Sequence, residues 1–382
     1  MIPLAVPDVT GNEAAYLQEC INSSYVSSVG PFVDRFESMV TEASGAAGAV
    51  AVSAGTTGLH LALHSLGVRP GDLVALPSLT FIASANAIAH CGAQPWLFDV
   101  DPDSWTVDVE QLAAVFRRDL QAAPNRPIHR PTQRPLAAIM PVHTLGHPAD
   151  MDPIVALGRE FGIPVIADAA AALGARYKQR PTGATGAAAT VFSFNGNKTV
   201  TAGGGGAIVS ADKDLLQRAR HLSTTARVGV EYDHDEVGFN YRMTNLQAAV
   251  GCAQMERLDR FIQRKRHCQA VYREAARAID GVDTFPEGPW AESACWFSGV
   301  VVQRGRPSKV ADLRAALRAD GIDARPFWKP MHLQRPYASA LVETQSVTNE
   351  LWTRIVTLPC STSITDSELN HVVAAIRRRL DQ

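Results

Sequence analysis

The chain has 382 residues, of which 46% are apolar and 19% are charged. This length and composition allow a sizeable core in one large domain with a smaller one, and they exclude global disorder. Thirty-six basic and 38 acidic residues give a net charge of −2, so no basic excess indicates binding to nucleic acid or to an anionic membrane.

The N-terminus and the cysteines bear on the cell compartment. Met1 to Asp8 has no basic segment, so we expect no signal peptide, and no apolar run approaches the roughly 20 residues that cross a bilayer. The six cysteines are scattered and form no CxxC pair, which favours reduced thiols in a cytoplasmic protein. The 11 histidines have no spacing typical of a metal site, so we predict no metal.

Short apolar strands alternate with helices over the first two hundred residues. This alternation predicts an α/β fold with a mostly parallel sheet. The polar, proline-rich stretch from Arg117 to Pro135 interrupts the pattern, and we expect a surface insertion there. We expect helices at residues 12–23, 31–44, 55–66, 81–91, 108–120 and 153–161, and strands at residues 50–53, 73–77, 94–98, 137–141, 165–167 and 191–194.

From Asn245 onward the pattern changes. A long helical stretch to about residue 279 precedes a strand at 294–302, a helix at 310–319 and a C-terminal helix at 366–381. This order predicts an α+β C-terminal part. We therefore divide the chain into a large α/β domain with an N-terminal arm, residues 1–250, and a small α+β domain, residues 251–382.

Two residues indicate the chemistry. Lys198 follows an apolar run and precedes four glycines, and a lysine in such a tight segment can be desolvated, which frees its amine to attack a carbonyl. Asp168, 30 residues upstream, ends the apolar strand at 165–167. Together they are the two anchors of a pyridoxal phosphate (PLP) enzyme, a Schiff-base lysine and an acid that keeps the pyridine nitrogen protonated. For either residue alone, a surface lysine or a helix-capping aspartate is the simpler alternative.

An ordered series of motifs extends over nearly the whole chain. It comprises Tyr25–Pro31, Ser53–Thr57, Pro77–Ala83, Pro141–His143, Asp150–Asp152, Asp168–Ala170, Ser193–Lys198 and Gly238–Arg242. The series resembles the DegT/DnrJ/StrS family of PLP-dependent nucleotide-sugar aminotransferases. The resemblance implies PLP as cofactor and the α/β fold type I of PLP-dependent transferases (aspartate aminotransferase-like), with a mostly parallel sheet in the large domain and a smaller α+β C-terminal domain.

The resemblance also implies a set of cofactor-binding residues. Lys198, the catalytic residue, would form the Schiff base and move the proton, Asp168 would pair with the pyridinium nitrogen, and Phe81 would stack on the ring. Asn240 would reach the phosphate of the neighbouring subunit's cofactor, which requires a homodimer with shared sites. A packed aromatic and an Asx-turn are the simpler alternatives for these last two residues. The full set is Gly55, Thr56, Thr57, Phe81, Asp168, Ser193, Asn195, Lys198 and Asn240, with the phosphate at the helix N-terminus that begins at Gly55.

Substrate contacts are implied by the same resemblance, and two positions depart from the family pattern. Ala171 stands where the family usually has a polar residue that can reach the cofactor or the sugar, and Leu145 stands where an aromatic residue is common. The alternative for the segment at 325–332 is an amphipathic turn that covers the core. The substrate-binding set is Ser28, His143, Arg325, Trp328 and His332.

The motifs Ser27–Gly30, Ser193–Lys198 and His234–Gly238 are similar to a narrower branch, which makes 4-amino sugars on UDP-N-acetylhexosamines on routes to bacillosamine and legionaminic acid. We therefore expect ping-pong transfer of an amino group from L-glutamate to the C4 ketone of a UDP-2-acetamido-4-keto-6-deoxyhexose. A dTDP- or GDP-linked substrate and a C3 ketone remain open.

Three other functions have less support in the sequence. The 3-dehydratase branch of the fold has histidine in place of the Schiff-base lysine, and Lys198 argues against it. A regulator that has lost catalysis would not need Lys198, Asp168, Ser193 and Asn240 together. A Rossmann dehydrogenase has little support, because the glycines at 203–206 form no strand–GxGxxG–helix unit.

Overall fold

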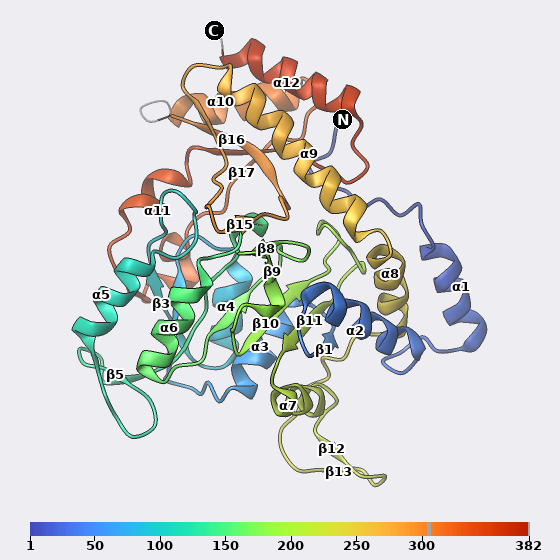
Figure 1. The fold of residues 1–382 in the computed structure, drawn as a ribbon, viewed down its shortest axis with the longest axis vertical. Helices are drawn as coiled ribbons and strands as arrows, with labels where there is room; N and C mark the ends of the chain where they lie inside the picture. The colour runs from blue at the N-terminus through green and yellow to red at the C-terminus, as the bar shows by residue number, and fades with distance from the viewer. Residues whose placement is uncertain (304–306, 381–382) are drawn as a thin grey trace.

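The computed structural model describes residues 1–303 and 307–380. A mixed central sheet carries helices on both faces, and an antiparallel sheet lies with the C-terminal helices at one end of the molecule (Figure 1). The helices are α1 (Glu13–Ser23), α2 (Pro31–Ser44), α3 (Gly55–Ser65), α4 (Ile82–His90), α5 (Val109–Asp119), α6 (Met151–Phe161), α7 (Lys213–Ser223), α8 (Asn245–Met255), α9 (Leu258–Arg277), α10 (Pro307–Ala319), α11 (Ser346–Leu351) and α12 (Asp366–Leu380).

The central sheet is mostly parallel, as predicted. Isolated bridges from residues 139 and 142 join β6 to β7, which gives the order β18-β3-β2-β6-β7-β10-β11-β1. In this order only β11 runs antiparallel to its neighbours. The strands are β1 (Gly48–Val52), β2 (Leu73–Pro77), β3 (Gln94–Phe98), β6 (Arg134–Ile139), β7 (Ile166–Asp168), β10 (Ala189–Ser193), β11 (Gly206–Ser210) and β18 (Leu341–Val342).

Both faces of this sheet are buried, which explains its apolar strands. Successive side chains of a strand point to opposite faces, so Val50 and Val52 pack with α3, α4 and α7, whereas Ala49 and Ala51 pack with α2 and α8. Residues of β2 divide in the same way, between α3 and α4 on one face and α5 and α6 on the other. The sheet therefore fixes the strand ends between two helical layers.

The C-terminal part is built on an antiparallel sheet of order β14-β16-β19-β17. Helices α9, α10 and α12 pack on it in one apolar cluster that also takes in Leu4 from the N-terminal arm. Its strands are β14 (Val282–Thr284), β16 (Ser298–Val302), β17 (Arg325–Pro326) and β19 (Ile355–Leu358). The remaining strands are two residues long: β4 (Leu120–Gln121), β5 (Ile128–His129), β8 (Arg176–Tyr177), β9 (Arg180–Pro181), β12 (Arg227–Val228), β13 (Asp233–His234) and β15 (Ala291–Glu292).

Several elements differ from the sequence prediction. The helical stretch from 245 is two helices, because Arg257 leaves helical geometry (φ −116°, ψ 10°) and binds the Asp8 carboxylate of the N-terminal arm at 2.6 Å. The strand predicted at 294–302 begins only at Ser298. Strand β11 and helix α7 were not predicted, because the glycine run masks the start of β11. Residue 381, the predicted end of the last helix, lies outside the described residues.

Other sequence predictions concern segments and compartment. The insertion at 117–135 contains the β4–β5 hairpin, which pairs with the start of β6. All six cysteines are free and buried. Within the described residues, no helix has both the length and the apolarity to cross a bilayer. The domain boundary at residue 250 falls inside α8, and it stays a prediction, as does the cytoplasmic location.

Candidate active site

A cavity of about 530 Å³ lies between the central sheet and the C-terminal sheet. The parallel strands direct their carboxyl ends into it, which is the edge where open α/β sheets bind ligands. Helix α3 points its N-terminus into the same space, and the C-terminal sheet closes the opposite wall. The polar and aromatic lining residues include Thr56, Thr80, Phe81, Ser84, His143, Asp168, Ser193, Asn195, Asn197, Lys198, Trp296, Arg325, Trp328 and Thr357.

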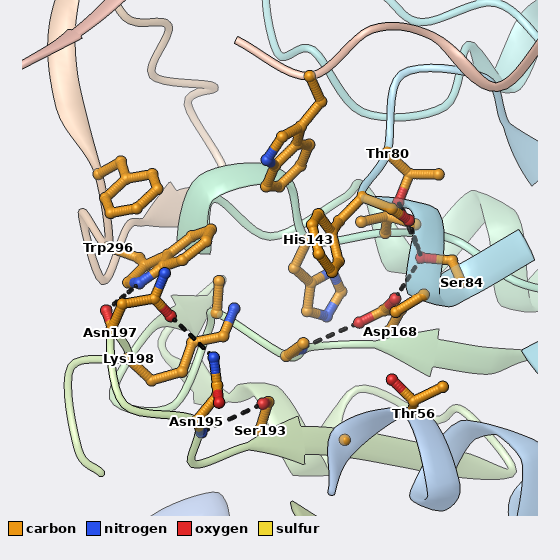
Figure 2. Close-up of a pocket in the computed structure, with 18 of the residues that line it drawn as sticks. Thr56, Thr80, Ser84, His143, Asp168, Ser193, Asn195, Asn197, Lys198 and Trp296 are labelled. Atoms are coloured by element: carbon orange, nitrogen blue, oxygen red, sulfur yellow. Dashed lines mark hydrogen bonds between the residues drawn. The ribbon is translucent and has the colours of Figure 1, made fainter. Parts of the chain in front are cut away.

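Lys198 lies in the connection between β10 and β11, with its side chain in the cavity (Figure 2). Its ammonium nitrogen is 3.5 Å from the centroid of the Trp296 ring. Burial lowers the pKa of Lys198 to about 7; the charge of Asp168 opposes this shift, and the charge of Lys265 adds to it. Near neutral pH a large fraction of this amine is therefore uncharged and nucleophilic.

Asp168 ends β7 and is only 5% exposed. Ser84 Oγ, from the first turn of α4, donates to its Oδ2 at 2.6 Å, and the Ala170 amide donates to its Oδ1 at 3.1 Å. Burial raises the pKa of Asp168, while these two bonds and the charge of Lys198 oppose the rise. Figure 2 shows Asp168 and Lys198 entering the cavity from different sides. The carboxylate is thus held in place for a cationic partner inside the cavity.

The N-terminus of α3 offers an anion site. The first amides of a helix have no intrahelical acceptor, and the helix dipole favours negative charge there. Gly55 and Thr56 line the cavity beside Ser193. A Cβ on Gly55 would lie 2.8 Å from the Cβ of Ser193, so only glycine allows α3 to approach β10 this closely. Thr57 does not line the cavity: its Oγ1 accepts from the Ala54 amide at 3.1 Å and caps the helix.

His143 places an unpaired donor in the cavity wall. The Ala149 amide donates to its Nδ1 at 3.2 Å, so the ring proton is on Nε2. Within the described residues Nε2 is buried and has no hydrogen-bond partner. Burial lowers the pKa of His143 to about 3, so the ring stays neutral. A buried donor without a partner can bind an acceptor atom of a ligand in the cavity.

The cavity has aromatic and cationic groups near solvent. Phe81 is 54% exposed, and its ring centroid lies 5.8 Å from that of Trp328. Arg325 binds Asp323 at 2.7 Å, with 59% of its side chain exposed. The structure thus brings together ten of the predicted residues: Gly55, Thr56, Phe81, His143, Asp168, Ser193, Asn195, Lys198, Arg325 and Trp328.

Four predicted residues do not line the cavity in the single chain. Besides Thr57, these are Ser28, Asn240 and His332. Both ring nitrogens of His332 are bonded, to Ser78 Oγ at 2.6 Å and to Asn349 Oδ1 at 2.8 Å, so this histidine is a structural link here. Asn240 is exposed, in the segment that follows β13.

Sequence reasoning missed Ser84, Thr80, Asn197 and Trp296, which all line the cavity. Thr80 is part of the motif Pro77–Ala83, so its place in the site could have been predicted from the sequence. Trp296 offered none, because only the fold brings the C-terminal sheet against the Lys198 loop.

Comparison with known proteins agrees with this geometry. The model of the DegT/DnrJ/EryC1/StrS aminotransferase family matches residues 7–377. EpsN of Bacillus subtilis (strain 168), assigned to the pyridoxal phosphate-dependent aminotransferases, is 36% identical over 380 residues, or 98% of this chain and 95% of EpsN. GDP-perosamine synthase of Caulobacter vibrioides (strain ATCC 19089 / CIP 103742 / CB 15) is 37% identical over 377 residues, or 98% of this chain and 97% of the synthase.

A solved structure shows the same fold. The aminotransferase TlmJ from Streptoalloteichus hindustanus superposes with a TM-score of 0.89 at 27% identity, covering 100% of this chain and 99% of TlmJ. All these matches extend over nearly the whole chain, so the cavity lies inside the matched region.

Proposed function

Because the chain belongs to the DegT/DnrJ/EryC1/StrS aminotransferase family and is a PLP-dependent sugar aminotransferase, we propose that it moves the amino group of L-glutamate to the ketone of a nucleotide-linked keto sugar. The observation that carries the proposal is the placement of Lys198 and Asp168 on different sides of one cavity that also receives the N-terminus of α3. A lysine, a buried acid and an anion site are what PLP requires.

The residues of the cavity fit this cofactor. The α3 amides at Gly55 and Thr56, with the hydroxyl of Ser193, would hold its phosphate. Asp168 would hold the protonated ring nitrogen, and the unpaired Nε2–H of His143 matches an acceptor on the ring or on the substrate. When bound, PLP supplies the electron sink that stabilises negative charge on the carbon next to the amine.

Lys198 would carry the protons of the reaction at Nζ. Its pKa of about 7 lets the amine accept a proton and return it near neutral pH, which suits general acid–base catalysis. The Trp296 ring beside Nζ excludes water from one side of the amine. His143, whose pKa of about 3 keeps it neutral, would orient the ligand by donating a hydrogen bond and would not exchange protons itself.

Phe81 would stack on the cofactor ring, and Arg325 and Trp328 would receive the nucleotide-sugar. Arg325 donates from Nε and Nη2 to the Asp323 carboxylate, so we assign its Nη1 to a phosphate or sugar oxygen of the substrate. Ala171 offers no polar group to the cavity, so the hydrogen bond that a polar residue would provide there must come from elsewhere in this chain.

We propose guanosine diphosphate as the first nucleotide to test. The motif branch favoured UDP, but the relative that is 37% identical over the whole chain is named a GDP-perosamine synthase. We keep C4 as the position of the ketone, as the motif branch implies, with C3 as the alternative.

We also propose a homodimer with shared sites. The β12–β13 hairpin and the segment after it expose large apolar side chains, with Val230 at 86%, Tyr232 at 83% and Val237 at 84%. A projecting segment with this much apolar surface favours contact with another chain, and a second copy of this chain would bring Asn240 to the partner's cavity.

The test begins with the purified full-length protein. Borohydride reduction followed by peptide mass spectrometry should locate the cofactor on Lys198, and L-glutamate should abolish the visible absorption band. GDP-, UDP- and dTDP-linked 4-keto sugars are then compared as acceptors by mass spectrometry of the product. The Lys198→Ala variant should make no product over repeated turnovers; continued turnover by this variant refutes the assignment. Cofactor attached elsewhere would refute it independently.

A further inference from the structure

Trp296 fixes the loop that carries Lys198. The indole Nε1–H donates to the carbonyl oxygen of Asn197 at 2.7 Å, so one side chain contacts both the backbone just before Lys198 and the ammonium of Lys198. Trp296 is 4% exposed, and Figure 2 shows its ring next to the side chain of Lys198. The position of the amine thus depends on a residue from the C-terminal half of the chain.

A second buried lysine holds Trp296. Lys265 of α9 is 1% exposed, and its ammonium donates to the carbonyl oxygen of Trp296 at 2.8 Å and lies 3.8 Å from Cys360 Sγ. Among the described residues, no carboxylate lies within ion-pair distance of this ammonium. Burying a cation without a counter-ion is costly, so a buried aliphatic side chain would be the ordinary choice here unless the charge has a role.

We propose that Trp296 and Lys265 are positioning residues for Lys198: the indole fixes the backbone and covers the amine, and Lys265 anchors Trp296 by its carbonyl and adds a second positive charge behind it. This inference rests on the proposed role of Lys198 as the amine that binds the cofactor. Lys265 acts through Trp296, and Trp296 contacts the Lys198 amine only with its ring face, which exchanges no proton. Their effect is on where the Lys198 amine lies and how readily it loses its proton.

The charges around Lys198 support this role for Lys265. Asp168 attracts the proton of Lys198, and Lys265 repels it. His143 lines the same cavity but stays neutral, and the charge of Arg325 is compensated by Asp323. Lys265 is therefore the nearby cation whose charge is least compensated by carboxylates of the described residues.

Trp296→Phe tests the hydrogen bond, because it keeps a ring and removes the indole N–H. In cofactor-free full-length protein, the pH dependence of Lys198 acylation, followed by mass spectrometry, gives the apparent pKa of the amine. Without this bond the loop loosens and water reaches the amine, which should raise this pKa by about 0.3 to 1 unit. Because the wild-type pKa is about 7, acylation at pH 7 should slow by about 1.5- to 5-fold. Trp290→Phe is the matched control, since its indole also donates to a backbone carbonyl, that of Pro148 at 3.0 Å, outside the cavity.

Lys265→Met tests the charge, and Lys265→Arg keeps it. Removing the second cation should raise the apparent pKa of Lys198 by about half a unit or more, given effective dielectric constants near 20, while Lys265→Arg should stay near wild type. In the loaded enzyme, the pH midpoint of the visible absorption band should move in the same direction. A purely structural role would lower the unfolding temperature and leave both titrations unchanged.

The outcomes separate this inference from the proposed function. If borohydride places the cofactor on Lys198 and both Trp296→Phe and Lys265→Met titrate like wild type, the positioning role is refuted and the proposed function stands. If Lys198 does not carry the cofactor, the proposed function fails, and the positioning role fails with it. If Lys265→Met does not fold, Trp296→Phe still decides the inference.

Discussion

Replacing Ser84 with alanine tests how the fold holds Asp168. The substitution removes a hydroxyl that donates to Asp168 Oδ2 at 2.6 Å and leaves the Ala170 amide at 3.1 Å in place. A hydrogen bond to a charged group contributes about 1.5–3 kcal/mol, and 1.36 kcal/mol corresponds to one pKa unit. The pKa of Asp168, which burial already raises, should therefore rise by about a further 1 to 2 units.

The consequence for PLP binding depends on pH. Only the ionised carboxylate pairs with the protonated ring nitrogen. When the pH lies below the pKa that Asp168 has in either protein, Ser84→Ala should therefore bind PLP about 10- to 100-fold more weakly than wild type. The ratio of the two PLP dissociation constants should fall toward one as the pH rises above both pKa values, because Asp168 is then ionised in either protein.

The assay is titration of cofactor-free protein with PLP between pH 5 and 9, followed by absorbance. Ser210→Ala is the matched control: it is a buried serine that donates to a backbone carbonyl at 2.7 Å, at the far end of β11 from the cavity. A dissociation constant for Ser84→Ala within twofold of wild type at every pH would refute the reasoning. A weakening of equal size at every pH would point to a general loss of structure, and Ser210→Ala would then show the same loss.

Three further predictions concern stability. Gly55→Ala should destabilise the protein by about 1–3 kcal/mol through overpacking against Ser193, whereas Gly196→Ala, whose Cβ would meet nothing within 4 Å, should change the free energy of unfolding by less than about 0.5 kcal/mol; urea unfolding compares the two. Glu37→Gln should lower the free energy of unfolding by about 3 kcal/mol in the same measurement, because Glu37 is buried and binds both Arg220 and Arg242 at 2.6 Å. A loss below about 1 kcal/mol would contradict a structural role for these two ion pairs. Folding lowers the pKa of Lys198 from 10.5 to about 7, so between these pH values the unfolded chain binds more protons and the contribution of Lys198 to stability grows with pH. The unfolding temperature of cofactor-free wild type should therefore rise from pH 7 to 10 relative to that of Lys198→Met. Unfolding temperatures that change equally with pH in both proteins would contradict the lowered pKa.

The site residues selected from the sequence belong mostly to motifs, whereas Ser84 and Lys265, which support them, were missed. Lys198 and Asp168 stand at the ends of apolar strands, so local pattern and chemistry sufficed to select them. Ser84 looks like an ordinary helix residue, and its bond to Asp168 exists only because α4 crosses the carboxyl end of β7. Lys265 looked like one more cation of a polar helix, and only the packing of α9 reveals its burial.

Prediction of the fold failed where distant segments decide local structure. The alternation of strands and helices was enough for a mostly parallel sheet. The break between α8 and α9 was not visible, because it depends on Asp8, about 250 residues from Arg257. In the segment expected to face the substrate, Arg325 and Trp328 line the cavity, whereas Ser78 and Asn349 bind both ring nitrogens of His332.

The dependence of Lys198 on Trp296 has a consequence for the order of events during synthesis. The ribosome releases Lys198 and its β10–β11 hairpin well before residues 265 and 296. A nascent chain that has formed only the central-sheet strands up to β11 thus carries Lys198 without the indole that covers it, and solvation keeps such an amine protonated and unreactive. We therefore expect the cofactor to bind only after the C-terminal sheet has docked, so that the later-made part of the chain determines when the enzyme matures.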